Sequence, residues 1–153
     1  MDRQQILELI YSSIEDSKTA VLAVCNIEGD PTMRWMTPAC LKDRPGSLFM
    51  ASDAKFAKVN FIRNHPSAEL MVQSRSLDRV INIRGGITVL DNVSIRLEVL
   101  ECVGSRLHAF WKASGNESDM VVLEFAMVDA TVYLPMTGER HTVHFLEQEH
   151  GTA

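Results

Sequence analysis

Short runs of β-branched and apolar residues, each bounded by turn residues, recur along the chain and constrain its fold more than any other feature. From the eight runs given below we expect roughly six or seven strands. Strands this short, separated mostly by turns, favour an antiparallel sheet that closes or nearly closes into a barrel. The runs span residues 19–26, 32–41, 47–52, 68–74, 80–90, 120–130, 131–135 and 140–145.

Helical periodicity is confined to a few segments. Apolar residues recur on one face of residues 2–17, so we expect an amphipathic helix at the start of the chain. Residues 54–64 should form a short helix, and residues 92–113 a longer helical segment that Gly104 divides. The expected class is therefore a β-dominated α+β fold, an antiparallel, Greek-key-like barrel with an N-terminal helix and short helices packed at its ends.

Two adjacent glycines, Gly85 and Gly86, interrupt the expected strand at residues 80–90. Glycine weakens a strand interior and usually marks a bulge or a place where another part of the chain approaches the backbone closely. We therefore expect a kink here, which would help a sheet to curve.

Size and charge restrict the classes of function. The 153 residues suit a single domain spanning residues 1–153, and a hydrophobic content of 46% suits a soluble globular protein. The formal net charge of −5 repels nucleic acid. Because no basic segment leads into a long apolar run after Met1, we expect no signal peptide, no membrane span and a cytoplasmic location.

Neither a disulfide framework nor a metal site is indicated. Cys25, Cys40 and Cys102 are odd in number, far apart and without a C-x-x-C pair. His141 and His144 would face opposite sides of a strand, so they could not easily bind one metal together. The sequence also lacks a serine nucleophile elbow, a Walker loop and an H-E-x-x-H helix.

Three cations stand close together in residues 29–66. Arg34 is expected in the strand after a Gly-Asp turn, and Lys55 and Lys58 in the helix that follows the next strand. A guanidinium offers a planar fork and an ammonium a mobile charge, so the group suits a phosphate ester of a small cofactor. Asp53 would compete with a phosphate on the helix axis, and we therefore expect the phosphate beside the lysines.

Short motifs in this region point to a family. G-x-P-x-x-R stands at residues 29–34, F-x-A-S at residues 49–52, and a lysine-bearing helix closed by N-x-P ends at Pro66. In this order, over nearly its whole length, the chain resembles the pyridoxamine phosphate oxidase-like flavin-binding split barrels, most closely the small members described as general stress proteins. The resemblance implies a split barrel that binds flavin mononucleotide (FMN) at the interface of a homodimer.

The resemblance also implies which residues bind the cofactor. The arginine of the second strand and the lysine of the helix would hold the phosphate, while the backbone after the arginine would contact the isoalloxazine ring. The end of the third strand would complete the site, and helical spacing adds one further lysine. The candidates are Arg34, Trp35, Met36, Thr37, Ala51, Ser52, Lys55 and Lys58.

Several positions depart from the family pattern. Phe56 and Ala57 stand where the family often has a small hydroxyl residue and sometimes an arginine, so two phosphate donors are missing. Val80 aligns near a flavin-contacting glutamine of the vitamin-metabolising enzymes, and their closing R-L-x-P segment is absent. A true pyridoxamine phosphate oxidase is therefore not expected.

The resulting hypothesis is an FMN-dependent oxidoreductase that acts on an unidentified small molecule. Hydride chemistry belongs to the flavin, so no side-chain nucleophile is required. The alternative is a non-catalytic sensor or binding barrel that holds flavin, a tetrapyrrole, a deazaflavin or no cofactor, and the missing phosphate donors favour it. An oligonucleotide-binding barrel is disfavoured because neither a basic groove nor an interleaved aromatic stripe is evident.

Overall fold

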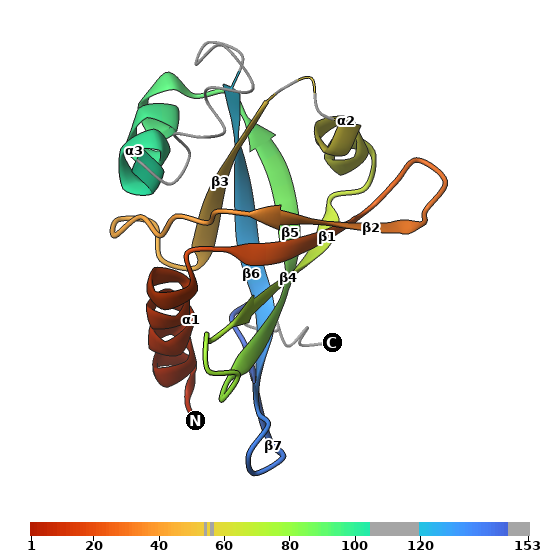
Figure 1. Ribbon diagram of the computed structural model, residues 1–153. Coiled ribbons are helices and arrows are strands. Elements are labelled where there is room, and N and C mark those ends of the chain that lie inside the picture. Colours follow the sequence, from red (N-terminus) through yellow and green to blue (C-terminus); the bar gives the residue numbers. More distant parts are fainter. Residues whose placement is uncertain (54, 56, 105–119, 147–153) are drawn as a thin grey trace, which may run out of the picture.

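The computed structural model describes residues 1–53, 55, 57–104 and 120–146 (Figure 1). These residues form a seven-stranded antiparallel sheet with three helices around it. The elements in chain order are α1 (Arg3–Ser17), β1 (Ala20–Cys25), β2 (Pro31–Met36), β3 (Ser47–Asp53), α2 (Ala57–Asn64), β4 (Ser67–Gln73), β5 (Val80–Leu90), α3 (Val93–Val103), β6 (Met120–Leu134) and β7 (Glu139–His144).

The sheet curls into a barrel that is closed by a single bridge. Its strand order is β2-β1-β4-β5-β6-β3, and β7 pairs with β6 beside this path. The chain just beyond β2 meets β3 through Ala39 and Phe49, which exchange backbone hydrogen bonds of 2.7 and 2.9 Å. The two end strands are otherwise not paired with each other. This arrangement confirms the predicted β-dominated split barrel.

Helix α1 begins at a capping box. The Asp2 carboxylate accepts from the Gln5 backbone N–H, and the Gln5 side chain accepts from the Asp2 N–H, both at 2.8 Å. Ile6, Ile10 and Ile14 are buried against the barrel core, which confirms the predicted N-terminal helix. No helix in the described part of the chain is both long and apolar enough to cross a membrane.

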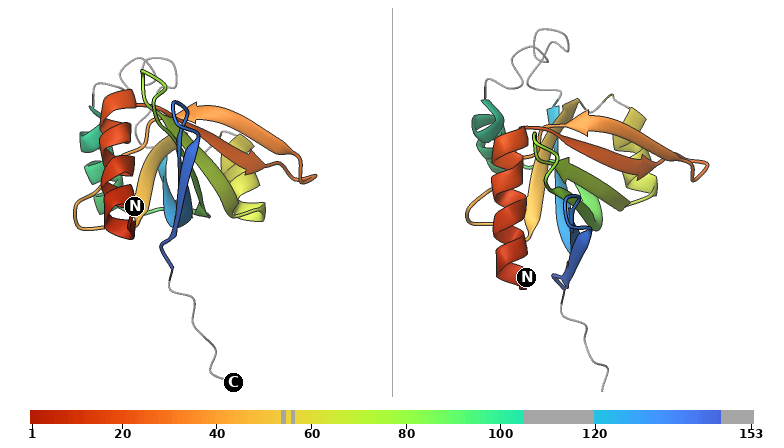
Figure 2. Two further views of the ribbon diagram at one scale, coloured as in Figure 1. Left: turned by 90° about the horizontal axis from the view of Figure 1, so that it is seen from below. Right: turned by 60° about the horizontal axis from the view of Figure 1, so that its bottom comes forward.

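The helices flank the barrel on two sides. In both views of Figure 2, α1 and α3 lie on one side and α2 on the other. Helix α3 is capped by Asn92, whose side chain accepts from the Ile95 N–H at 3.2 Å, and it ends at Gly104. Helix α3 thus ends at the glycine where a division was predicted, while the rest of the predicted segment, residues 105–113, lies outside the described residues.

Strand β6 corrects one prediction. Residues 120–130 and 131–135 were expected to be separate runs, but Met120–Leu134 is one continuous strand. It pairs with β5 on one edge and with β3 and β7 on the other, so sheet hydrogen bonds keep it continuous through Asp129. That carboxylate is tolerated inside the strand because Arg84 of β5 pairs with it, with Nε 3.1 Å from each oxygen.

The prediction for the adjacent glycines is confirmed. The register between β5 and β6 shifts between Arg84 and Gly85, which marks a bulge or irregularity. A Cβ atom on Gly85 would lie 2.5 Å from the Ala126 carbonyl oxygen and 2.6 Å from the Phe125 ring. The backbone therefore approaches β6 so closely at this point that a side chain has no room.

Candidate anion-binding end of the barrel

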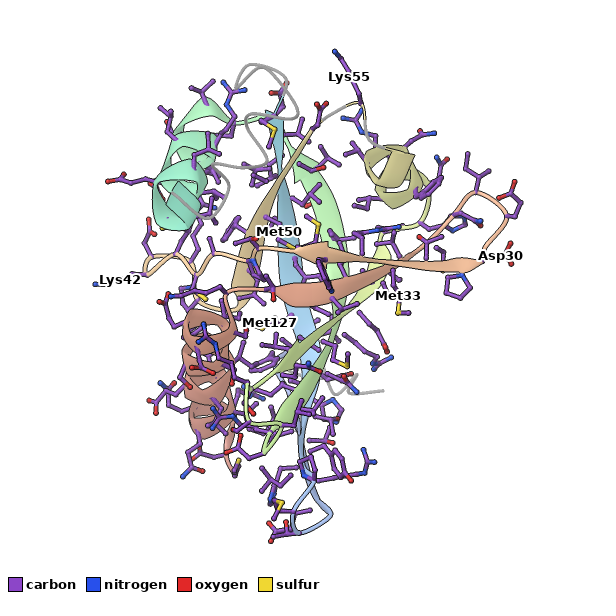
Figure 3. The ribbon with its side chains drawn as sticks, viewed as in Figure 1. Asp30, Met33, Lys42, Met50, Lys55 and Met127 are labelled. Carbon is purple, nitrogen blue, oxygen red and sulfur yellow. The ribbon has the colours of Figure 1, made fainter. Side chains whose placement is uncertain are left out.

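Strand β2 places Arg34 on the barrel's inner face. Thr32, Arg34 and Met36 share that face because strand side chains alternate. In the register with β1, Arg34 lies opposite Leu22, which is fully buried in the core. Its neighbour Met33 points to the side of the β1–β2 hairpin away from α2 (Figure 3). The Arg34 side chain therefore projects toward the side of the hairpin on which α2 packs.

The guanidinium of Arg34 is only partly satisfied. Its Nη2 donates to the Thr32 hydroxyl at 2.6 Å, whereas its Nη1 is buried and has no hydrogen-bond partner among the residues that the structure describes. Burial lowers the pKa of the Arg34 guanidinium, yet arginine keeps its charge in proteins. A buried cationic donor without a partner is costly, so this atom suits an anion that would fill the remaining position.

The two lysines differ in their positions. Lys58 is the second residue of α2, which packs against β1 and β5, so its backbone lies near the same end of the barrel as Arg34. Lys55 precedes the helix, and its side chain extends outward from the loop after β3 in Figure 3. The helix expected over residues 54–64 begins only at Ala57, so the prediction that Lys55 lies within it is wrong. The Asp53 carboxylate accepts from the Lys55 backbone N–H at 2.9 Å, a local turn contact that holds Lys55 in the loop before α2.

The remaining candidates surround the seam between β2 and β3. Thr37 follows β2, and Ala51 lies within β3. The antiparallel bridge between Ala39 and Phe49 puts Thr37 and Ala51 on the same side of that bridge, each two residues from it. Ser52 is buried and donates its hydroxyl to the Asp53 carbonyl at 3.3 Å. The backbone after Arg34 and the end of β3 therefore meet at one opening of the barrel.

Two other candidates point in opposite directions. Met36 belongs to the core and is 8% exposed, whereas Trp35 is 82% exposed on the outer face of β2. Any contact of these residues with a ligand at the Arg34 face would therefore use the backbone rather than the Trp35 side chain.

The outer face of the β2-β1-β4 sheet carries an apolar stripe. Trp35 and Met33 are 82% and 73% exposed, and their partners on β1 are the half-buried Val21 and Ala23. Met71 of β4 continues the row beside Val21. These five residues are called the outer stripe below. A row of exposed apolar side chains on an edge strand is typical of an interaction surface.

A cleft of about 530 Å³ lies farther along the same outer face. Arg84 and Glu69 provide its charged groups, and its lining includes none of the eight candidate residues. A hydrogen bond from Arg84 holds the pKa of the Asp129 carboxyl below its usual range. The sequence did not predict the ion pair between Arg84 and Asp129, because the two residues are 45 positions apart and only the pairing of β5 with β6 brings them together. The one signal in the sequence was that each of these two strands carries a charged residue, Arg84 or Asp129, within a largely apolar run.

Within residues 1–53, 55, 57–104 and 120–146, no group of three histidine, cysteine, aspartate or glutamate side chains could hold a metal ion. His141 contacts Glu139 at 3.2 Å, and His144 lies 4.0 Å from Asp129. These two histidines therefore have different carboxylate neighbours.

Comparison with known proteins adds a family match. Residues 5–148 match the family described as "Pyridoxamine 5'-phosphate oxidase like". No curated protein matches the chain in sequence.

Several solved structures share the fold. A protein from Clostridium acetobutylicum, related to general stress protein 26 of B. subtilis, is 13% identical with a TM-score of 0.74, over 95% of this chain and 97% of its own. A pyridoxamine 5'-phosphate oxidase-related, FMN-binding protein from Nostoc punctiforme is 15% identical with a TM-score of 0.66, over 94% and 96%. A heme-binding protein from Mycobacterium smegmatis is 16% identical with a TM-score of 0.71, over 94% of this chain and 60% of its own.

Proposed function

Because the chain belongs to the pyridoxamine 5'-phosphate oxidase-like family, we propose that it binds FMN at the Arg34 end of the barrel and serves as a flavin-dependent oxidoreductase of a small molecule. The observation that carries the proposal is the buried Nη1 of Arg34, which lacks a partner within the described part of the chain. A phosphate oxygen would satisfy this donor and neutralise the half-buried charge. The FMN-binding relative from Nostoc punctiforme supports the choice of anion.

The chain's own groups have binding and orienting roles in this proposal. Arg34 of β2 and Lys58 of α2 bind the phosphate, with Lys55 as an auxiliary cation. The backbone from Trp35 to Thr37 and that of Ala51 and Ser52 flank the opening and position the ring. When bound, the flavin supplies the hydride chemistry, so the chain needs neither a nucleophile nor a metal.

Comparison of FMN with riboflavin tests the proposal, because the two ligands differ only in the phosphate. We expect the purified protein to bind FMN at least about tenfold more tightly than riboflavin, since one charge-assisted hydrogen bond contributes at least that much. Quenching of flavin fluorescence measures both affinities. Equal affinities would contradict the phosphate site, and reduction of the bound flavin by a nicotinamide cofactor, followed by turnover of an acceptor, would support the enzymatic role.

The outer stripe supports the further proposal that the protein is a homodimer with the cofactor at the subunit interface. Trp35 and Met33 are exposed, and the acidic residue next to the stripe, Glu69 of β4 beside Ala23, lies opposite Arg84 of β5, so a cation stands next to the carboxylate at this edge of the stripe. A twofold dimer places the same surface on both partners, which an uncharged apolar row permits. Trp35 follows Arg34 directly and lies on the opposite face of the same edge strand, so the interface and the anion site would share β2.

A charge in the outer stripe should dissociate this dimer. Trp35→Glu puts a carboxylate into the apolar row at its most exposed member, and we expect sedimentation to change from dimer to monomer because a buried unpaired charge is very costly. Met136→Glu is the matched control, since Met136 is 86% exposed in the turn after β6 and lies outside the stripe. A wild-type monomer, or a Trp35→Glu dimer of unchanged affinity, would refute the proposed interface.

A second candidate is a non-catalytic protein that binds heme. Two observations favour it: the fold is shared with a heme-binding protein, and Phe56 and Ala57 replace two expected phosphate donors. The Arg34 guanidinium could pair with a heme propionate as well as with a phosphate, because both are anions that accept a bidentate fork. Titration with hemin separates the candidates: a saturable Soret band without FMN binding would favour heme.

A further inference from the structure

We infer that Thr32 is a positioning residue that holds the Arg34 guanidinium in the orientation needed to receive an anion. This inference rests on the proposed phosphate site, and it assigns a role to a residue outside the motif positions that suggested that site. Thr32 and Arg34 are neighbours on the inner face of β2, two positions apart along the strand.

The direction of the hydrogen bonds carries the argument. The Thr32 hydroxyl donates its proton to the Val24 carbonyl oxygen at 3.0 Å across the β1–β2 pair. With that proton committed, the oxygen can only accept from Arg34, and Nη2 donates to it at 2.6 Å. The β1 backbone thereby fixes the polarity of the Thr32 hydroxyl, and the hydroxyl fixes one arm of the guanidinium fork.

Fixing one arm determines where the other points. The guanidinium is planar, so anchoring Nη2 restricts rotation of the whole group and leaves Nη1 as the buried donor without a partner. A side chain held in place before binding loses less conformational freedom when the anion arrives, which increases affinity without adding a contact to the ligand. Thr32 thus acts on the phosphate through Arg34.

Two substitutions separate the hydroxyl from the shape of the side chain. Thr32→Val keeps the β-branched volume but removes the acceptor, whereas Thr32→Ser keeps the acceptor. We expect Thr32→Val to weaken FMN binding about tenfold and Thr32→Ser to stay within about twofold of wild type. Riboflavin affinity should stay unchanged in both, because the effect passes through the phosphate. Thr142→Val, on the exposed strand β7, is the matched control.

A double-mutant cycle and a ligand-free measurement complete the test. In the Arg34→Ala background, Thr32→Val should no longer change FMN affinity, because its partner is gone. In ligand-free protein, the Arg34 Nη resonances should show hindered rotation in wild type and Thr32→Ser, and free rotation in Thr32→Val. Thermal unfolding of each variant separates lost folding from lost positioning.

The outcomes distinguish the two proposals. Equal affinity of wild type for FMN and riboflavin would refute the phosphate site, and the NMR comparison would still decide whether Thr32 restrains Arg34. The positioning role is overturned if Thr32→Val leaves both the NMR signals and the FMN preference unchanged. It is equally overturned if Thr32→Val weakens riboflavin binding as much as FMN binding, or if its effect persists in the Arg34→Ala background.

Discussion

Replacing both Arg34 and Lys58 by alanine is expected to weaken FMN binding by about a hundredfold or more while riboflavin binding stays nearly unchanged. The physical reason is that each cation contributes a charge-assisted interaction with the phosphate, and the phosphate dianion left without either would lie unpaired beside the apolar residues of the barrel. Arg34→Lys should give an intermediate loss, since it keeps the charge but not the fork. Fluorescence titrations at low and high salt measure these affinities.

The matched control removes the same amount of charge elsewhere. Lys42 and Arg75 are exposed and lie in segments outside the candidate site, and Figure 3 shows Lys42 on the side of the barrel opposite Lys55 and the β1–β2 hairpin tip. Lys42→Ala combined with Arg75→Ala therefore reproduces the change in net charge without touching β2 or α2. An FMN affinity of the Arg34 and Lys58 double variant equal to that of this control would refute the phosphate site.

Gly85→Ala is expected to lower the free energy of unfolding by about 3 kcal/mol, at the upper end of what overpacking usually costs. The added methyl group would lie 2.5 Å from the Ala126 carbonyl oxygen, which belongs to the backbone of β6 and cannot move without disturbing the ladder. It would also meet the ring of Phe125, which is fully buried in the core. Urea unfolding followed by circular dichroism measures the change, and the melting temperature should fall by roughly 10 °C.

The neighbouring glycine is the control. A Cβ atom on Gly86 would meet nothing within 4 Å, and its φ lies outside the left-handed region that favours glycine. Gly86→Ala should therefore change stability by less than about 1 kcal/mol, and it reduces the freedom of the unfolded chain in the same way as Gly85→Ala. Comparable losses in the two variants would show that the close approach at Gly85 does not limit stability.

Local patterns in the sequence predicted most of the fold. The alternation within residues 80–90 predicted β5 with the bounds that the structure has, and the two glycines predicted the irregularity within it. The periodic first segment predicted α1. The division of β6 was wrong because Asp129 breaks the apolar pattern locally, whereas its pairing with Arg84 is a contact between distant parts of the chain. The backbone ladders with β5 and β7 on either side of Asp129 keep β6 continuous.

The candidate site could be predicted only in part, for the same reason. The motif with Arg34 identified a cation in the second strand, but which face the side chain takes depends on its register with Leu22 of β1. The partner of its Nη2, Thr32, lies within the same motif and was not singled out, because the role of its hydroxyl depends on the Val24 carbonyl across the strand pair. Whether the Thr32 hydroxyl donates or accepts toward Arg34 is therefore decided only when β1 and β2 pair.

The single bridge between Ala39 and Phe49 makes the barrel a source of backbone donors and acceptors. In a fully closed barrel every strand has two neighbours, so the backbone N–H and C=O groups of each strand form hydrogen bonds within the sheet. Here β2 pairs with β1 and β3 with β6, and in the part of the chain that the structure describes no strand pairs with their facing edges beyond that bridge. Stopping the ladder after one bridge leaves the backbone N–H and C=O groups of Thr37 and Ala51 without a partner among the described strands, and these are the groups that the proposed function assigns to the ring of the flavin.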